Sequence, residues 1–310
     1  MEIAEREILH SKRHFLETRC RVLRLIRAFF EKEGFLEVET PILTAAPAPE
    51  VHIRPVPTTT GLFLSTSPEL HMKRMLAAGF EKIFQITRSF RAGERGRLHH
   101  PEFAILEWYR AGADYKDLQE DCQRLVRFTC RAITPKSGLH FQGMPLDFEG
   151  PWERYSVREA VRKFAGWDPG PDPDQDRFDI DMTQKIEKNL GFPAPCILED
   201  YPRSQAALAR IKPSEPEVAE RFELFWAGIE LANGFSELTD PKEQRIRFQS
   251  AIEKKEQFEG TRYPLPEAFL TSLEHLHPCA GVALGVDRLV MLLAGTEGID
   301  DVVAFTPEMG

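Results

Sequence analysis

Apolar residues recur at helical spacing in two long segments of the chain. Between Lys12 and Glu33 they fall on one helical face, which three- and four-residue steps generate, at Phe15, Val22, Leu25, Ile26 and Phe29. This pattern predicts an amphipathic helix, and Gly34 is a fitting C-terminal cap. From Tyr115 to Ala132 one side is again apolar, with Leu118, Cys122, Leu125, Val126 and Thr129. A third, more polar helix is expected from about Lys242 to Phe258.

A two-residue alternation predicts two strands on either side of a charged loop. From Phe84 to Arg91 one face carries Gln85, Thr87, Ser89 and Arg91, and from Phe103 to Tyr109 one face carries Phe103, Ile105, Glu107 and Tyr109. If the intervening loop closes a hairpin, Arg91 lies beside Phe103, with Glu107 and Tyr109 further along the same face. That face would combine an anion clamp, an aromatic plate and an ammonium site. For Arg95 and Arg97, an ordinary solvated loop tip is an equal alternative.

Shorter segments complete the expected α+β fold, an antiparallel sheet flanked by helices. Phe35 to Pro41 alternates and stops at proline, as an edge strand does, and Cys196 to Leu198 indicates a buried strand. Ser67 precedes a helix that begins with Pro68 and Glu69. We expect one domain over residues 1–310, with a variable insertion at about 134–195 that contains an acidic, turn-rich surface loop.

The overall composition excludes several classes of protein. The 310 residues are 42% hydrophobic, which supports a substantial core, and the net charge of −9 argues against a broad nucleic-acid surface but leaves room for a local basic groove. The five cysteines form no C-x-x-C pair, which disfavours a zinc site or a disulfide framework and suits a reducing cytoplasm. Neither a signal peptide nor a membrane span is predicted.

Two acidic residues and a glycine-rich helix entry suggest further chemistry. Glu230 and Glu237 are seven apart, a spacing that places side chains on opposite faces of an unbroken strand. A bulge at Asn233-Gly234 would restore parity, so that the two carboxylates converge on a divalent cation and its phosphate ligand. Exposed acids on an edge strand are the alternative. In the segment 281–293, Gly285 would permit close ligand approach, and Arg288 would stack on a purine or bind a terminal phosphate.

Taken in order, these segments resemble the class II aminoacyl-tRNA synthetase catalytic domain, specifically its lysyl branch. Gly34 to Pro41 resembles motif 1, Phe90 to Phe103 motif 2, and Gly281 to Arg288 motif 3. The run from Asn233 to Glu237 is of the lysyl type. Within the branch, similarity to the paralogues that modify elongation factor P is found in the runs 67–74, 100–103, 106–110, 228–235 and 281–288.

This resemblance implies adenylation of lysine or (R)-β-lysine with ATP and Mg²⁺, followed by transfer to a lysine of elongation factor P as the acceptor protein. It implies Arg91 as the catalytic residue. The implied ATP-binding residues are Arg91, Ala92, Gly93, Glu94, His99, His100, Phe103, Glu230, Leu231, Gly285 and Arg288. The implied amino-acid-binding residues are Ser67, Pro68, Glu69, Glu107, Tyr109, Asn233, Phe235, Glu237 and Ala283, and the implied metal ligands are Glu230 and Glu237.

The sequence departs from the family pattern at several places. Motif 2 usually reads Phe-Arg-x-Glu, but Gly93 stands at the acid position and Glu94 follows it. The synthetase's Arg-His-Asn becomes Leu98-His99-His100, with Arg97 one place early. At Ala283 the synthetases have glycine, and the added methyl would displace an α-amino group and favour a β-amino acid.

The resemblance also implies a homodimer and the lack of an anticodon-binding domain. Motif 1 builds a dimer interface in this family, so a homodimer is expected. Because motif 1 begins almost at the N-terminus, we expect no OB-type anticodon-binding domain and no anticodon-reading interaction with tRNA.

Three other functions remain open at this stage. A free-standing lysyl-type enzyme would charge tRNA, and a small-molecule amide ligase would need no protein acceptor. A non-catalytic paralogue should have lost its phosphate or metal groups, whereas this chain keeps Arg91, Glu230, Glu237 and Arg288.

Overall fold

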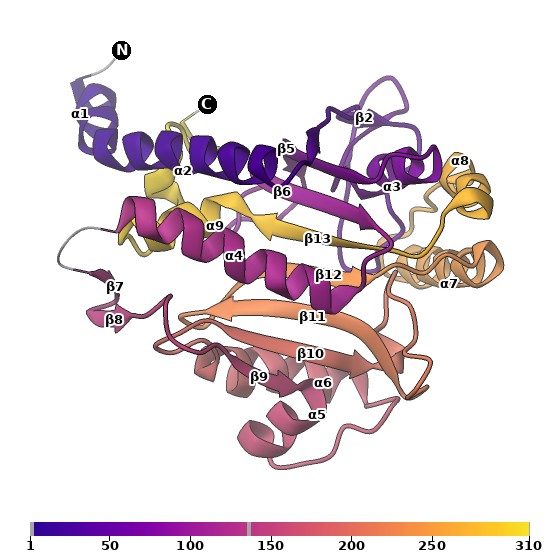
Figure 1. Cartoon of the computed structure of the whole chain (residues 1–310). Coiled ribbons are helices and arrows are strands. Elements are labelled where there is room, and N and C mark those ends of the chain that lie inside the picture. Colours follow the sequence, from indigo (N-terminus) through magenta and orange to yellow (C-terminus); the bar gives the residue numbers. More distant parts are fainter. Residues whose placement is uncertain (1–2, 135–137, 310) are drawn as a thin grey trace.

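An eight-stranded sheet forms the centre of the computed structural model, which describes residues 3–134 and 138–309 (Figure 1). Its central strands are antiparallel, and the edge pairs β1–β5 and β9–β10 are parallel. The predicted α+β fold is confirmed. In spatial order the strands are β1 (Leu36–Glu37), β5 (Lys82–Phe90), β6 (Glu102–Ala111), β13 (Cys279–Gly285), β12 (Ile229–Ser236), β11 (Val218–Trp226), β10 (Cys196–Pro202) and β9 (Glu153–Ser156).

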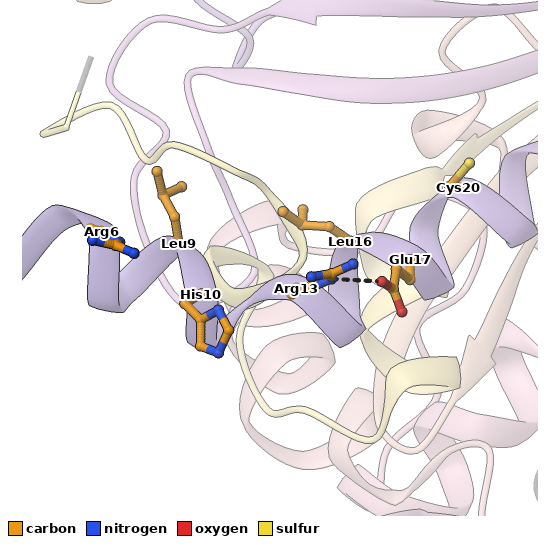
Figure 2. Close-up of a pocket in the computed structure, with 7 residues that line it drawn as sticks. All are labelled: Arg6, Leu9, His10, Arg13, Leu16, Glu17 and Cys20. Carbon is orange, nitrogen blue, oxygen red and sulfur yellow. Dashed lines mark hydrogen bonds and ion pairs between the residues drawn. The ribbon is translucent and has the colours of Figure 1, made fainter. Parts of the chain in front are cut away.

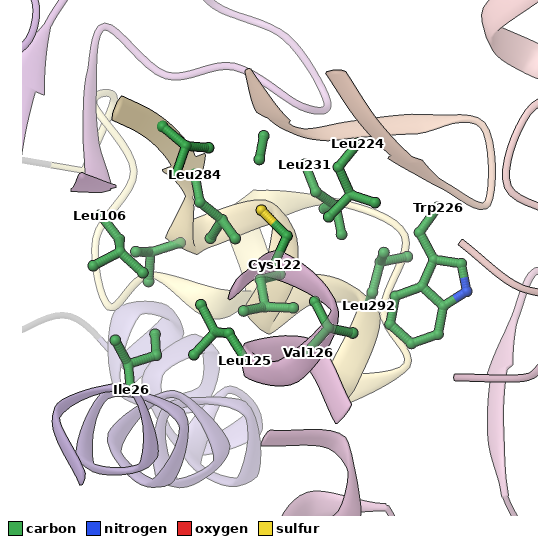
Figure 3. Close-up of a cluster of buried hydrophobic side chains, with 14 of the residues drawn as sticks. Ile26, Leu106, Cys122, Leu125, Val126, Leu224, Trp226, Leu231, Leu284 and Leu292 are labelled. Atoms are coloured by element: carbon green, nitrogen blue, oxygen red, sulfur yellow. The ribbon is translucent and has the colours of Figure 1, made fainter. Parts of the chain in front are cut away.

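Helices α2 (Arg13–Lys32), α4 (Tyr115–Ile133) and α9 (Val286–Ala294) cover one face of this sheet (Figure 1). The apolar stripes predicted for the first two helices supply the main core, where Ile26 and Leu125 meet Leu106 of β6 (Figure 3). At one end of this core the rings of Phe30 and Phe84 stack with centroids 4.7 Å apart. The spacing of apolar residues therefore predicted which helix faces are buried.

The ends of these helices follow from local sequence. Gly34 has φ +76°, a left-handed conformation that ends α2 as expected. At the start of α4, the side chain of Asp114 accepts hydrogen bonds from the backbone N–H groups of Lys116 and Asp117, and the Asp117 side chain accepts one from the backbone N–H of Asp114. This capping box fixes where α4 leaves β6.

The opposite face of the sheet is framed by helices α3 (Glu69–Ala77), α7 (Pro241–Glu259) and α8 (Glu267–Ser272). A second buried cluster joins these helices to Ile83 and Tyr109 of the sheet. A small three-stranded sheet of β2 (Leu43–Thr44), β4 (Phe63–Leu64) and β3 (Val56–Pro57) precedes α3. The strand expected from Phe35 to Pro41 is reduced to β1, because the chain leaves the sheet after Glu37.

The segment proposed as an insertion is more structured than a surface loop. It holds the hairpin of β7 (Leu139–Phe141) and β8 (Met144–Leu146), helices α5 (Val157–Ala160) and α6 (Gln175–Asp181), and two π-helical turns, Val161–Ala165 and Met182–Ile186. Strand β9 joins the main sheet beside β10, and a third buried cluster packs the helices on it. An irregular, turn-rich stretch does connect them at 166–174. Residues 135–137 of the expected insertion lie outside the described residues.

In the part of the chain that the structure describes, helix α1 (Ile3–Ser11) precedes α2, and four short 3-10 turns lie at Glu187–Asn189, Arg203–Gln205, Leu273–His275 and Ile299–Val302. All five cysteines are free thiols. Across 3–134 and 138–309, every helix is too short or too polar to cross a bilayer.

Candidate active site

Neighbouring strands place five polar or small side chains in one row on the open face of the sheet. Glu107 pairs with Ala283, Ala283 with Asn233, and Asn233 with Glu223. Gln85 pairs with Glu107 at the other end of the row. Because directly opposed residues of antiparallel strands project to the same face, the register brings Glu107, Ala283 and Asn233 together as predicted.

A second row, two residues further along each strand, lies on the same open face, and the site around it is called the pocket below. It runs from Tyr109 through Gly281 and Phe235 to Arg221. A Cβ atom on Gly281 would overlap the ring of Tyr109 and lie 2.7 Å from Glu237 Oε1. The absence of a side chain at Gly281 therefore lets Tyr109 and Glu237 approach each other.

Three buried carboxylates gather in this pocket. Glu107 accepts hydrogen bonds from Ser67 Oγ at 2.5 Å and from the Tyr109 hydroxyl at 2.7 Å. Glu69, in the first turn of α3, accepts one from Lys73 Nζ at 2.5 Å, and Lys73 also forms an ion pair with Glu237. Ser67 Oγ in turn accepts the backbone N–H of Glu69, so Ser67 links α3 to β6.

Burial perturbs the acids of this pocket. Desolvation, with a contribution from the nearby Glu69 charge, raises the pKa of Glu107 to about 7 against the opposing hydrogen bonds of Ser67 and Tyr109. Desolvation likewise raises the pKa of Glu237 to about 8, although the Lys73 charge lowers it. Carboxylates that are this hard to ionise alone are suited to bind ammonium groups, which restore the charged form.

Arg91 and Phe103 lie together at the far end of the same face, as the hairpin predicted. The Arg91 guanidinium is 4.9 Å from the centroid of the Phe103 ring. Its Nε is buried and has no hydrogen-bond partner among the described residues. A buried donor without an acceptor is suited to an anionic ligand, which supports the proposed phosphate contact.

The departures in motif 2 have a local explanation. Gly93 has φ +81°, a conformation that a glutamate would adopt only with strain, and Ala92 and Gly93 form the turn after β5. Glu94 Oε1 instead lies 3.9 Å from Arg91 Nη1. Glu94 thus stays beside Arg91 although it is shifted by one residue.

Arg288 connects three segments of the site. Its Nη1 donates to the backbone oxygen of Glu230 at 2.7 Å and lies 3.3 Å from Glu230 Oε2, while Nη2 is 2.7 Å from His99 Nε2. Burial and the Arg288 charge lower the pKa of His99, which favours the neutral ring as acceptor. At the start of α9, a Cβ on Gly285 would make only ordinary contacts with Arg288.

Two neighbouring basic side chains and one histidine are engaged elsewhere. Arg95 pairs with Asp300 and Glu308, and Arg97 donates to the backbone oxygen of Glu297. His100 is buried, with Nε2 2.5 Å from Asp300 Oδ1. The His100 ring therefore anchors the C-terminal segment through Nε2, so its proposed ATP contact would need the other ring nitrogen.

The expected convergence of Glu230 and Glu237 is wrong. The bulge in β12 lies at Leu231 rather than at Asn233-Gly234, since Leu224 pairs with Ala232 and Phe225 with Glu230. It restores parity, but the two acids remain roughly 20 Å apart along the strand, at about 3.3 Å per residue. Glu237 belongs to the pocket with Lys73. The side chain of Leu231 packs in the core, so only its backbone could contact ATP.

Glu223 is the carboxylate that accompanies Glu230. Burial and the charge of Glu230 raise the pKa of Glu223, while Arg221 lowers it. Arg221 Nη2 donates to Glu223 Oε1 at 2.7 Å, and Arg221 Nε donates to Asn233 Oδ1 at 3.2 Å. Two like charges on adjacent strands favour a divalent cation between them.

These donors fit Mg²⁺ but do not enclose it. Among the residues that the structure describes, no group of three or more histidine, cysteine or acidic side chains is placed to hold a metal ion. Mg²⁺ typically takes one or two carboxylates and completes its shell with water and phosphate oxygens. Glu223 and Glu230 match that requirement.

Three residues of the site, Lys73, Arg221 and Glu223, escaped the sequence reasoning. Lys73 follows Glu69 by four residues, a helical spacing that places both on one face. Glu223 precedes Glu230 by seven, but only the strand register reveals that the two are near, because Glu230 lies opposite Phe225, two residues from Glu223.

A groove of about 480 Å³ on helices α1 and α2 lies apart from these residues (Figure 2). It is lined by Arg6, Leu9, His10, Arg13, Leu16, Glu17 and Cys20. None of the predicted site residues contributes to it.

Comparison with known proteins agrees with this architecture. The family profile described as tRNA synthetases class II (D, K and N) matches residues 8–309. An elongation factor P–(R)-β-lysine ligase of Vibrio atlanticus is 40% identical over 306 residues, covering 94% of each chain. Ligases of the same name from Vibrio cholerae and Klebsiella pneumoniae are also 40% identical, over 94% and 93% of each chain.

Proposed function

The chain belongs to the class II tRNA synthetases of the D, K and N type, and on this premise we propose that it is an ATP-dependent ligase for elongation factor P. It would adenylate (R)-β-lysine or lysine and transfer the aminoacyl group to the ε-amino group of a lysine on that protein. The observation that carries the proposal is the pocket of three buried carboxylates, Glu69, Glu107 and Glu237, on the same sheet face as Arg91.

The pocket favours a substrate with ammonium groups. Glu107, Tyr109 and Glu237 would accept the ammonium at the end of the side chain, and Ser67 and Glu69 the second amine near Pro68. Asn233, Phe235 and Ala283 would line the space between them. An aspartate side chain would meet like charges in a desolvated site, which costs far more than it would in water. These residues are therefore poorly suited to an aspartyl or asparaginyl enzyme of the same fold.

In the proposed first step, a carboxylate oxygen of the amino acid attacks the α-phosphorus of ATP. A P–O bond forms as the bond to the leaving pyrophosphate breaks, which leaves an aminoacyl-adenylate. Arg91 would contact the α-phosphate, and Phe103 would stack on the adenine. Ala92 to Glu94, the Leu231 backbone and Gly285 would line the nucleotide, while Arg288 and His99 would lie towards the purine and outer phosphates. When bound, Mg²⁺ neutralises phosphate charge, and Glu223 and Glu230 would hold it.

In the second step, the ε-amine of the acceptor lysine attacks the carbonyl carbon of the adenylate. The new amide bond forms, AMP leaves with the electron pair of the broken acyl carbon–oxygen bond of the mixed anhydride, and the amine loses a proton. No side chain of the enzyme needs to form a covalent intermediate. Catalysis would depend on alignment and charge neutralisation, for which the rigid strand register is suited.

Intact-mass measurement of elongation factor P tests the proposal directly. Elongation factor P is incubated with ATP, Mg²⁺, this protein and either lysine isomer, and ATP is omitted in the control. We expect a gain of one lysine residue that depends on ATP and is larger with (R)-β-lysine. An unchanged mass with both isomers, while ATP–pyrophosphate exchange proceeds, would indicate a different acceptor. A parallel incubation with total tRNA would reveal aminoacylation of tRNA instead.

We also propose that the protein forms a homodimer through the edge that carries motif 1. Leu36, Ile42 and Leu43 are large apolar side chains with 53%, 42% and 48% of their surface exposed. They lie at or just after β1, the end strand of the main sheet. Sedimentation of the wild-type protein and of Leu43→Glu should distinguish a dimer from a monomer.

A further inference from the structure

Lys73 is a buried cation inside the amino-acid pocket that the proposed reaction does not use. It projects from α3 and is only 1% exposed. Its ammonium lies between Glu69 and Glu237, 5.0 Å from the centroid of Phe235 and 6.0 Å from that of Phe269. A lysine held in this way carries a fixed charge rather than a mobile, solvated one.

The environment of Lys73 keeps it protonated. Burial alone would lower its pKa, but the carboxylates of Glu237 and Glu69 outweigh burial and raise the pKa above its ordinary value. The two acids and the lysine therefore form a charged triad. Breaking such a triad at one member leaves an uncompensated buried charge.

The other charged groups around the pocket have partners of their own. Arg221 pairs with Glu223, and Arg210 pairs with Glu220. Burial raises the pKa of Glu50, and the charge of Arg91 is the largest influence that lowers it. The hydroxyl of Tyr109 is neutral because burial raises its pKa. What remains is three carboxylates and one ammonium, Glu69, Glu107, Glu237 and Lys73, or three negative charges and one positive.

The pocket thus has a net charge of −2 when its acids are ionised. Without a ligand this charge is incompletely satisfied, because neither carboxylate oxygen of Glu237 has a hydrogen bond among the described residues, apart from the ion pair with Lys73. Glu237 is 1% exposed, so water does not compensate it. An unsatisfied buried carboxylate of this kind points to a positively charged ligand.

We propose that Lys73 is a specificity-determining residue whose fixed charge sets the pocket to −2 and so matches a substrate with two ammonium groups. This inference rests on the proposed function for the identity of the substrate. A pocket with a net charge of −3 would retain one proton. A pocket with a net charge of −1 would leave one ammonium group of the substrate without a partner. Lys73 acts through Glu69 and Glu237 and needs no contact with the reacting atoms.

The inference is tested by calorimetric binding of lysine, (R)-β-lysine and 6-aminohexanoate, which carries a single amine. Four proteins are compared: wild type, Lys73→Met, Glu69→Gln and the double variant. Their pocket charges are −2, −3, −1 and −2. We expect Lys73→Met to bind either lysine isomer at least tenfold more weakly, and Glu69→Gln to lose much of the preference for two amines over one.

The double variant gives the decisive result. If charge balance sets specificity, Lys73→Met/Glu69→Gln binds lysine isomers more tightly than either single variant and regains the preference over 6-aminohexanoate. Removal of both partners also spares the fold a lone buried charge, so this variant remains testable if Lys73→Met fails to fold. The inference would be overturned if the double variant binds lysine no more tightly than both single variants. If Lys73→Met fails to fold, the comparison is with Glu69→Gln alone.

A matched control and a separate readout keep the two proposals distinct. Lys12 is also buried, but its ammonium meets the backbone oxygen of Val303 outside the pocket, so Lys12→Met should leave lysine affinity unchanged. Wild type that binds lysine without catalysing ATP–pyrophosphate exchange would contradict the proposed adenylation, while the order of affinities still decides the role of Lys73. Wild type that binds neither isomer would overturn both.

Discussion

The ring of Tyr109 occupies the space that a side chain on Gly281 would need. The two residues are paired on β6 and β13, and the phenol hydroxyl reaches from there to Glu107. We predict that Gly281→Ala displaces Tyr109, raises the KM for lysine at least tenfold and lowers the melting temperature by several degrees, as overpacking of about 1–3 kcal/mol would do. Exchange kinetics and thermal unfolding measure both effects.

Gly96 provides the control for that substitution. An added Cβ there would meet no atom within 4 Å, and its backbone is not left-handed. Gly96→Ala should therefore resemble wild type in melting temperature and lysine KM. Equal behaviour of the two variants would show that Gly281 is not needed for the approach of Tyr109.

Arg91 should be required for adenylation. Its guanidinium lies over Phe103 with an unpaired buried donor, and loss of a charge-assisted contact that strengthens as the phosphorus is attacked lowers kcat. Arg91→Ala is expected to reduce ATP–pyrophosphate exchange by at least a hundredfold. Arg95→Ala, which removes a cation engaged by Asp300 and Glu308, should keep most of the exchange. Exchange at the wild-type rate in Arg91→Ala would contradict the assigned role.

Lysine binding should strengthen as the pH rises. The pKa of Glu107 is raised to about 7 and that of Glu237 to about 8, so below these values the acids are protonated and cannot neutralise an ammonium. The KM for lysine should fall between pH 6 and pH 8.5, while the KM for ATP changes little. Glu107→Gln should remove part of this dependence. A lysine KM that is independent of pH in wild type would argue against both carboxylates as acceptors.

Ala283 should influence which lysine isomer is used. Its side chain lies between Glu107 and Asn233 in the row that crosses the sheet. Removal of one methyl from a packed pocket changes discrimination by roughly tenfold or more. Ala283→Gly is expected to shift the ratio of kcat/KM from (R)-β-lysine towards α-lysine by about that factor, measured by exchange with each isomer. An unchanged ratio would remove Ala283 from the determinants of specificity.

Local patterns were sufficient for the long helices α2, α4 and α7 and for the hairpin that joins Arg91 to Phe103. Periodicity reports which face of an element is buried, and the cross-strand contact of Arg91 follows from a single hairpin. The insertion was harder, because β9 pairs in parallel with β10 some forty residues later. The sequence of either strand alone does not indicate such a pairing.

The two acids expected to hold the metal ion show the same limit within one strand. Parity correctly predicted that a bulge brings Glu230 and Glu237 to one face, yet an asparagine-glycine pair was a misleading signal for its position. Gly234 instead lies in regular register, where a Cβ would approach Phe222 and Val282 too closely. Two residues on one face of a strand can still lie far apart, and Glu230 and Glu237 are placed to contact different ligands. Only the register of β11 identifies Glu223.

Substitution of each acid should separate metal binding from amino-acid binding. Glu223→Gln removes one charge from the pair that would hold Mg²⁺ but leaves the lysine pocket intact. We expect it to raise the Mg²⁺ concentration for half-maximal exchange about tenfold with little change in lysine affinity measured without ATP. Glu237→Gln should instead weaken lysine affinity and leave the Mg²⁺ requirement nearly unchanged, because its carboxylate faces Lys73 and Tyr109 rather than the phosphates. If Glu237→Gln instead raised the Mg²⁺ requirement and Glu223→Gln did not, the assignment of Glu223 and Glu230 as the metal pair would be wrong.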